Sequence, residues 1–225
     1  MVELRRCQVY GQLQTEGSDA KLIRRGDTML NIRVFVICVA GILLLITSIR
    51  GQNEADFGLG HQHSFVYVTN QGSFGEGNTV SVIATASNTV VDTITVGQGP
   101  NFVTASPNGR FAYVSNSRSD TVSVVDTATN TVVSTITVGN GPGSIAFTPH
   151  GNLAYVPNGD SDSVSVINTA TNQVVATIDG ISIPAEIAIT PDGESAYVTN
   201  LWTNGNPANG NAVGSVSVID IDRNM

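Results

Sequence analysis

Basic residues are scarce in this chain of 225 residues. After Gly51 there are three arginines and no lysine, against fourteen aspartates and glutamates, so this part carries a net charge of −11. Proteins that bind nucleic acid gather lysine and arginine on one face to contact phosphates. The composition therefore excludes nucleic acid as a partner.

Cysteine is also rare. The only two, Cys7 and Cys38, lie before and inside an apolar segment near the amino terminus. The remainder of the chain cannot contain a disulfide framework, so its stability must come from packing.

Histidine occurs three times, which limits metal chemistry. His61 and His63 are two residues apart and could together chelate a transition metal, but no cysteine or carboxylate adjoins them. We interpret this pair as polar linker. His150 occupies a turn position where related segments carry Asn108 and Asp192, and we interpret it as a solvated turn residue. No metal site and no cofactor are predicted.

Apolar stripes with a helical period are absent after the amino-terminal segment. The chain instead repeats itself: segments 79–109, 121–151 and 163–193 share one pattern at an interval of 42 residues. Prolines at 100, 142 and 184 mark the same interval. A period of roughly 40 to 45 residues is typical of β-propeller blades.

Four units begin with related hexapeptides: FVYVTN at Phe65, FAYVSN at Phe111, LAYVPN at Leu153 and SAYVTN at Ser195. Each is followed by a Val-Ser-Val segment, and β-branched residues alternate with small polar ones, which predicts strands. Apolar residues on both faces of a strand suit sheets packed between neighbours. The predicted fold is all-β, a β-propeller of four-stranded blades with repeats at 65–110, 111–152, 153–194 and 195–225.

The turns within these units have recognisable chemistry. Asp126 and Asn168 each open a five-residue turn in which their side chains can cap the backbone. Asn130 and Asn172 close those turns, and asparagine tolerates the left-handed conformation expected there.

One apolar run precedes the repeats. It covers Val34 to Ile46 and extends to Ile49, six basic residues precede it, and Arg50 follows. This asymmetry predicts a cytoplasmic amino terminus and export of everything after Arg50. We expect a helix over 34–49, serving as a signal peptide or a membrane anchor, followed by a linker over 50–64. Residues 1–33 are either a cytoplasmic segment or, up to residue 28, a consequence of start-codon choice, since Met29 would make an ordinary start. The expected location is periplasmic or on the cell surface.

The tetrapeptides at Tyr67 and Tyr197, with their variants at Tyr113 and Tyr155, resemble YVTN-type β-propeller repeats. The Val-Ser-Val, Gly-x-Gly-Pro and Pro-x-Gly segments that follow agree with the resemblance, which covers about Phe65 to Asp220. Such repeats are similar to those of archaeal and bacterial surface-layer proteins. More distantly, they are similar to the propellers of nitrous-oxide reductases, haem-d1 nitrite reductases, amine dehydrogenases and lactonases.

Blade number departs from this family, whose propellers commonly close with seven blades. The chain holds about four periods, and its last unit stops without an outer strand. The segment DFGLG before Phe65 is a poor candidate for the inner strand of the first unit. A four-bladed ring, a fragment of a larger propeller and a half-ring completed by a second chain all remain open. We expect self-association through the incomplete blades.

Two loops between the second and third strands are longer than in the middle units. Because antiparallel strands alternate in direction, both insertions must leave the same end of the ring. They contain the candidate interaction residues Phe74, Trp202, Asn204 and Asn206, which suit contact with a protein or a carbohydrate. The alternative is tolerated variation in a surface loop.

No catalytic constellation is present. Asp160 with Asp162, and Asp220 with Asp222, do not lie in a calcium-loop pattern. The sequence lacks a Cys-x-x-Cys-His segment and a Gly-x-Ser-x-Gly elbow. We predict a non-enzymatic binding or structural surface module. The alternative is a fragment of a periplasmic propeller enzyme.

Overall fold

The described part of the chain folds into four antiparallel sheets. The computed structural model describes residues 33–39, 42–50, 64–72, 75–204 and 213–224. Apart from short 3₁₀ turns, at Gly75 and at Gly159–Ser161, every regular element in these residues is a strand, so the all-β prediction is confirmed there. Each of the four sheets is named after its order in the chain, from A to D.

Neighbours in each sheet follow the order of the sequence. Sheet A contains β1 (Arg33–Val39), β2 (Ile42–Arg50), β3 (Ser64–Asn70), β4 (Thr79–Ala84) and β5 (Thr89–Thr95). Sheet B contains β6 (Pro100–Ala105), β7 (Phe111–Asn116), β8 (Thr121–Asp126) and β9 (Thr131–Thr137). Sheet C contains β10 (Ala146–Phe147), β11 (Leu153–Asn158), β12 (Ser163–Asn168) and β13 (Gln173–Asp179). Sheet D contains β14 (Pro184–Ile189), β15 (Ser195–Asn204) and β16 (Val213–Asp220).

Sheets B, C and D therefore each begin at a connector proline or shortly after it. The repeats read from the sequence start one strand later, so the middle repeats run from the second strand of one sheet to the first strand of the next. The strands differ in burial according to their place. Five of the six residues in β7 are buried, whereas Ile136 is the one buried residue of β9. Middle strands are thus covered on both faces, and outer strands on one.

An asparagine of the tyrosine-containing strand closes the hairpin to the next strand in every sheet, and it is buried in sheets B, C and D. In sheet B, the Nδ2 atom of Asn116 donates to Oγ1 of Thr121 at 3.1 Å and to Oγ of Ser123 at 3.0 Å. Equivalent pairs of hydrogen bonds are made by Asn70, Asn158 and Asn200. The last residue of the Tyr-Val-Thr-Asn motif thus ties the start of the Val-Ser-Val strand to the strand before it.

Apolar cores form between neighbouring sheets. Tyr67, Val80 and Val82 of sheet A pack on Val103, Val114 and other residues of sheet B. The same arrangement recurs between sheets B and C and between sheets C and D. This packing bears out the interpretation that both faces of each inner strand are covered by a neighbouring sheet.

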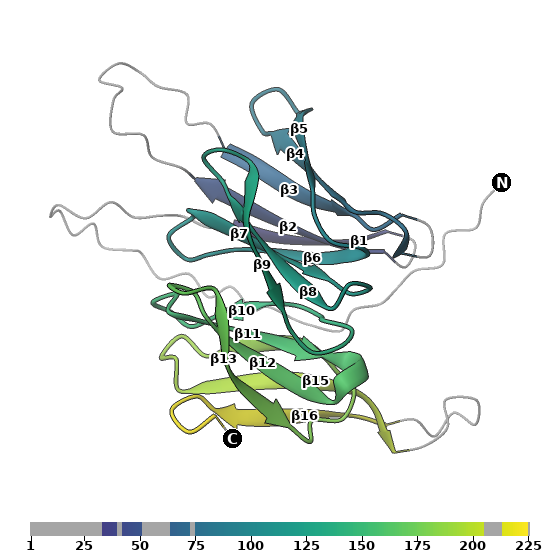
Figure 1. Cartoon of the computed structure of the whole chain (residues 1–225), viewed down its shortest axis with the longest axis vertical. Helices are drawn as coiled ribbons and strands as arrows, with labels where there is room; N and C mark the ends of the chain where they lie inside the picture. Colours follow the sequence, from purple (N-terminus) through teal and green to yellow (C-terminus); the bar gives the residue numbers. More distant parts are fainter. Residues whose placement is uncertain (1–32, 40–41, 51–63, 73–74, 205–212, 225) are drawn as a thin grey trace, which may run out of the picture.

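The four sheets follow one another along the long axis of the molecule (Figure 1). Sheet A packs on B, B on C and C on D, but within the described residues no strand of sheet D packs comparably on sheet A. Sheet D has three strands and leaves Tyr197, Val216 and Val218 exposed. The described sheets thus form an open fan of blades rather than a closed ring.

The segment over 34–49, where the sequence predicts a helix, contains two strands in the described residues. β1 and β2 form an antiparallel hairpin, with Val39 opposite Ile42, and β2 then pairs with β3, with Thr47 opposite Tyr67. A short apolar run rich in valine and isoleucine does not distinguish a helix from a buried strand by its period. Here the free edge of β3 offers such a run backbone hydrogen-bonding partners.

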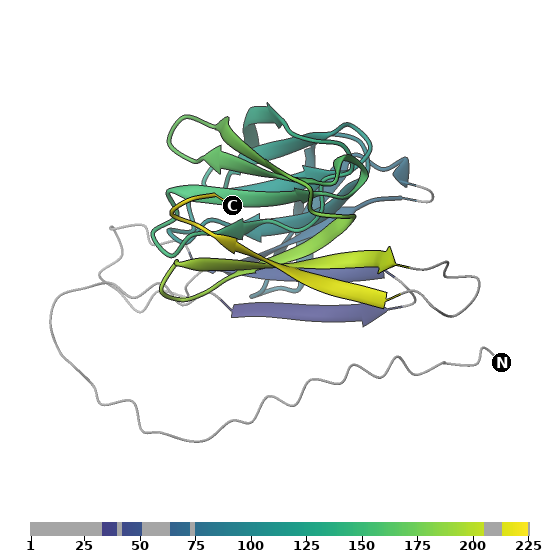
Figure 2. The ribbon, with the colours of Figure 1, turned by 90° about the horizontal axis from the view of Figure 1, so that it is seen from below.

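This hairpin also changes the account of the first blade. β2 pairs with β3 as β6 pairs with β7 in sheet B, and β1 lies beyond β2 at the edge of sheet A. Figure 2 shows both amino-terminal strands beside the fan. The segment DFGLG lies outside the described residues. The same is true of residues 1–32 and 51–63, so the leader and linker boundaries stay predictions. No helix in the described part of the chain is long and apolar enough to cross a membrane.

The asparagine that closes each hairpin generates a stability prediction. Replacing Asn116 by Ala removes two hydrogen bonds and leaves the buried Ser123 hydroxyl without its partner. We expect the free energy of unfolding to fall by about 2–3 kcal/mol, measured by urea denaturation. The exposed Asn152 is the matched control, and Asn152→Ala should change the free energy of unfolding by less than about 0.5 kcal/mol. Equal effects at the two positions would contradict the assigned role.

Candidate functional site

One end of the fan collects the connectors between sheets and the loops between second and third strands. Their backbones are hydrogen-bonded: Ser117 N to Gly99 O at 3.0 Å, Gly159 N to Gly141 O at 3.0 Å, and Leu201 N to Ile183 O at 2.9 Å. We call residues 71–72, 75–78, 96–99, 117–120, 138–141, 159–162 and 180–183, with Leu201, the loop end. Both sequence insertions leave the sheets here, as the alternation of strand direction predicts.

Two aspartates hold the connectors of the loop end. The Asp120 carboxylate accepts a hydrogen bond from Gly141 N at 3.0 Å, and the Asp162 carboxylate accepts one from Ile183 N at 2.7 Å. Gly141 has a φ of 64°, and Ile183, at the same place in the next repeat, has a φ of 42°. A β-branched residue is strained in this region, and such strain persists only where surrounding contacts enforce it.

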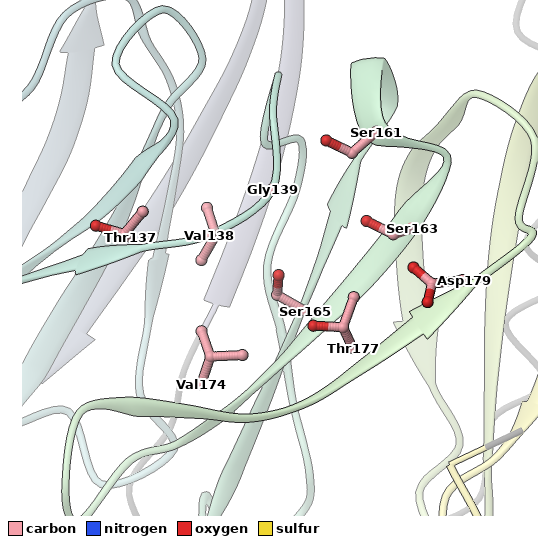
Figure 3. A pocket seen from close by; sticks show the side chains of 9 residues that line it. All are labelled: Thr137, Val138, Gly139, Ser161, Ser163, Ser165, Val174, Thr177 and Asp179. Atoms are coloured by element: carbon pink, nitrogen blue, oxygen red, sulfur yellow. The ribbon is translucent and has the colours of Figure 1, made fainter.

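A groove of about 390 Å³ opens between sheets B and C next to the loop end. Its lining residues are Thr137, Val138, Gly139, Ser161, Ser163, Ser165, Val174, Thr177 and Asp179 (Figure 3). Most of these side chains carry a hydroxyl, and Asp179 adds a carboxylate. The groove is therefore suited to a polar ligand that both donates and accepts hydrogen bonds.

The hydroxyls at the base of the groove are oriented by the fold. Ser163 and Ser165 are almost fully buried, and both Oγ atoms accept hydrogen bonds from Nδ2 of Asn158, at 3.1 Å and 3.0 Å. Because these oxygens already accept, their own protons remain to be donated. The asparagine that closes the hairpin thus also orients two donors at the groove.

The candidate interaction residues are only partly described. Phe74 and Asn206 lie outside the described residues, as do His61 and His63. Trp202 and Asn204 belong to β15, which continues past the pair Asn200–Ser215 to the pair Asn204–Val213. The start of the second insertion is therefore a strand that extends its hairpin beyond the blade, where a loop had been expected.

The structure also describes two other positions that the sequence analysis singled out, His150 and Asp220. His150 is an exposed turn residue and lines a smaller cavity of about 230 Å³ with Asn108 and Tyr113. Asp220 forms an ion pair with Arg223 at 3.7 Å. Within the described residues, no group of three or more histidine, cysteine, aspartate or glutamate side chains could hold a metal ion.

Sequence reasoning missed one recurrent contact between sheets. Its donors are the tyrosines of the repeat motif, and its acceptors are asparagines that close a turn in the next sheet. The hydroxyl of Tyr67 donates to Oδ1 of Asn130 at 2.8 Å. Tyr113 donates to Asn172 at 2.9 Å, and Tyr155 to Asn224 at 2.7 Å. The sequence did contain a signal for this contact, because the tyrosine and the asparagine both recur in consecutive units.

The turn chemistry is as predicted, and it positions these acceptors. Asn130 and Asn172 both have a φ of 53°, in the left-handed region. Asp126 and Asn168 accept backbone hydrogen bonds within their own turns. The asparagine side chain at each turn therefore faces the preceding sheet in a defined position.

Burial changes the acidity of these tyrosines. Desolvation raises the pKa of Tyr113 to about 12. Desolvation, with smaller contributions from the Asp92 and Asp126 charges, raises the pKa of Tyr67 to about 12. The pKa of Tyr155 is raised for the same main reason. The contact between sheets therefore needs the protonated phenol.

The repeated sheets, the cores between them and the tyrosine contacts define a β-propeller repeat protein. Comparison with known proteins agrees at this level. A model of YNCE-like β-propellers matches residues 101–204. The structure is similar to Kuenenia stuttgartiensis hydrazine synthase, with a TM-score of 0.63 and 28% sequence identity.

That similarity covers 71% of this chain and 44% of the hydrazine synthase chain, so the aligned part spans less than half of that protein's length. No curated protein matches the chain. The comparisons support a β-propeller repeat, as expected from the resemblance, without selecting the YVTN type.

The raised pKa values predict alkaline sensitivity. Below pH 10 the phenols are protonated in both states, so the full stability is present. Above it, tyrosines of the unfolded chain ionise at their ordinary pKa of 10.0, while Tyr67 and Tyr113 stay protonated until about 12. Stability should therefore fall as pH rises from 10 to 12, by about 1.4 kcal/mol per pH unit for each such tyrosine.

Urea denaturation at pH 9, 10 and 11 measures this slope. The Tyr113→Phe variant, which has no phenol to ionise at this position, should show a shallower decline than the wild type. A free energy of unfolding that does not change over this range would contradict the role given to the buried tyrosines.

Proposed function

We propose that the chain is a non-enzymatic propeller module that binds a partner protein at its loop end. The groove between sheets B and C is the observation that supports this most directly. It combines oriented hydroxyl donors, Ser163 and Ser165, with the carboxylate of Asp179. A cleft of this volume can receive a side chain or a short segment of a partner.

The charge of the loop end indicates which kind of segment fits. Glu76, Asp120 and Asp160 surround the connectors, and Arg118 is the one basic residue among the loop-end residues described. Electrostatic complementarity raises association rates and selects partners. The partner segment is therefore basic, with a lysine or arginine that reaches Asp179.

A short oligolysine peptide tests this proposal by titration calorimetry on the whole chain. We expect binding that weakens with added salt. In the Asp179→Asn variant, binding should weaken about fivefold, the equivalent of roughly 1 kcal/mol. The matched control is Asp92→Asn, which removes an exposed carboxylate on β5, away from the groove, and should leave binding nearly unchanged.

Two results would contradict this assignment. In the first, the oligolysine peptide does not bind, or its binding does not depend on salt. Alternatively, neutral oligosaccharides could bind with a dependence on Asp179 while the peptide does not, in which case the partner is a carbohydrate.

We also propose that this module works outside the cytoplasm. The basic residues before Val34 and the acidic character after Gly51 support this location. Protease added to intact cells, or to spheroplasts where an outer membrane is present, should digest the region after Arg50. Complete protection, with recovery of the protein in the cytosol, would contradict export.

A second candidate is the propeller portion of an enzyme. The similarity to hydrazine synthase over 71% of this chain favours it. The peptide titration separates the two candidates, because an enzyme portion of this kind has no need of a salt-sensitive site for a basic segment.

A further inference from the structure

The last sheet presents a face that its counterparts bury. Tyr197, Val216 and Val218 of sheet D are 47%, 59% and 56% exposed. The residues at the same positions in sheet B, Tyr113, Val122 and Val124, are at most 1% exposed, because sheet C covers them. Sheet D thus carries the apolar surface and the tyrosine of a sheet-to-sheet contact, and no sheet among the described residues covers it.

The first sheet presents the complementary side. Asn88 closes the turn between β4 and β5 with a φ of 52°, as Asn130 and Asn172 do in the next two sheets. Asn88 is exposed, and no side-chain hydrogen bond of Asn88 is found within the described residues. Val66, Val68 and Ile83 lie on the same side of sheet A and are only partly covered, whereas their counterparts in sheet B are fully buried.

We propose that the exposed face of sheet D binds the exposed side of sheet A in a second copy of this chain. In this contact, the hydroxyl of Tyr197 donates to Oδ1 of Asn88 in the partner. The donor, the acceptor and the apolar residues around them occupy the same positions in their sheets as the residues of the three contacts within one chain. This contact joins the two ends of the fan and is independent of binding at the loop end.

Symmetry and blade number favour a pair of copies. A contact between two different faces generates a ring when the rotation closes and an open filament when it does not. Closed propellers typically have four to eight blades. The described residues of one chain supply four sheets, so two copies supply eight, whereas three copies would exceed this range. The pair contains two equivalent D-to-A contacts.

Sedimentation of the whole chain across a dilution series tests the pair. We expect a species of about twice 23.5 kDa that dissociates on dilution. The Val218→Asp variant should weaken association at least on the order of 100-fold, because it places an unpaired charge in the contact. Val133→Asp is the matched control, since Val133 is 52% exposed on the outer strand β9. It should associate like the wild type.

Milder variants test the hydrogen bond. Tyr197→Phe should weaken each contact about fivefold, and so should Asn88→Gly, which keeps a residue that tolerates positive φ. If Tyr197 and Asn88 contact each other, the double variant should associate no more weakly than either single variant. Circular dichroism should show an unchanged β-type spectrum for every variant.

Mixing variants tests the head-to-tail arrangement. Val218→Asp blocks only the D face, and Ile83→Asp blocks only the A side, so each variant alone should be monomeric. Their mixture should form a heterodimer through the one intact contact. A wild-type chain that is monomeric at every concentration would overturn the proposal. So would association that Val218→Asp leaves intact, or that Val218→Asp abolishes and Ile83→Asp leaves unchanged.

Discussion

The structure depends on covering sheets that are apolar on both faces. Val122 and Val124 point to one neighbour of sheet B and Val114 and Val125 to the other, and all four are fully buried. Such a sheet cannot be stable alone in water, since burying each valine contributes roughly 1.5–3 kcal/mol only while a neighbour is present. The repeat is the simplest way to supply that neighbour, because every blade is both a covering surface and a surface to be covered.

Polar groups decide how the sheets are placed. An apolar face alone would allow neighbouring sheets to slide, because the hydrophobic effect has no direction. The tyrosine hydroxyl that meets an asparagine of the next blade fixes both position and rotation. The asparagine that closes each hairpin has a similar role within a sheet. At Asn158 it also orients the serines that line the groove, so the same residues provide fold stability and a binding surface.

The amino-terminal apolar run shows what a sequence pattern leaves open. Its apolar composition and basic flank are equally typical of a signal helix, and no period in Val34–Ile49 separates helix from strand. What decides the outcome is a partner: the inner edge of β3 has unpaired backbone groups, and β2 satisfies them. The groove was also beyond prediction, because its two walls come from different repeats, and the Gly-x-Gly-Pro and Val-Ser-Val segments that contribute Gly139 and Ser165 do not show that they face each other.

Sequence alone determined the all-β class, the interval of 42 residues, the strand and turn chemistry and the common end of the two insertions. These follow from local periodicity and from the conformations that asparagine, glycine and proline allow. Tertiary structure alone decided that Tyr113 meets Asn172, that Ser163 lines a groove, and that sheet D stays uncovered. Each of these depends on how one blade is rotated against the next, and this rotation is set by the packing of side chains from distant parts of the chain.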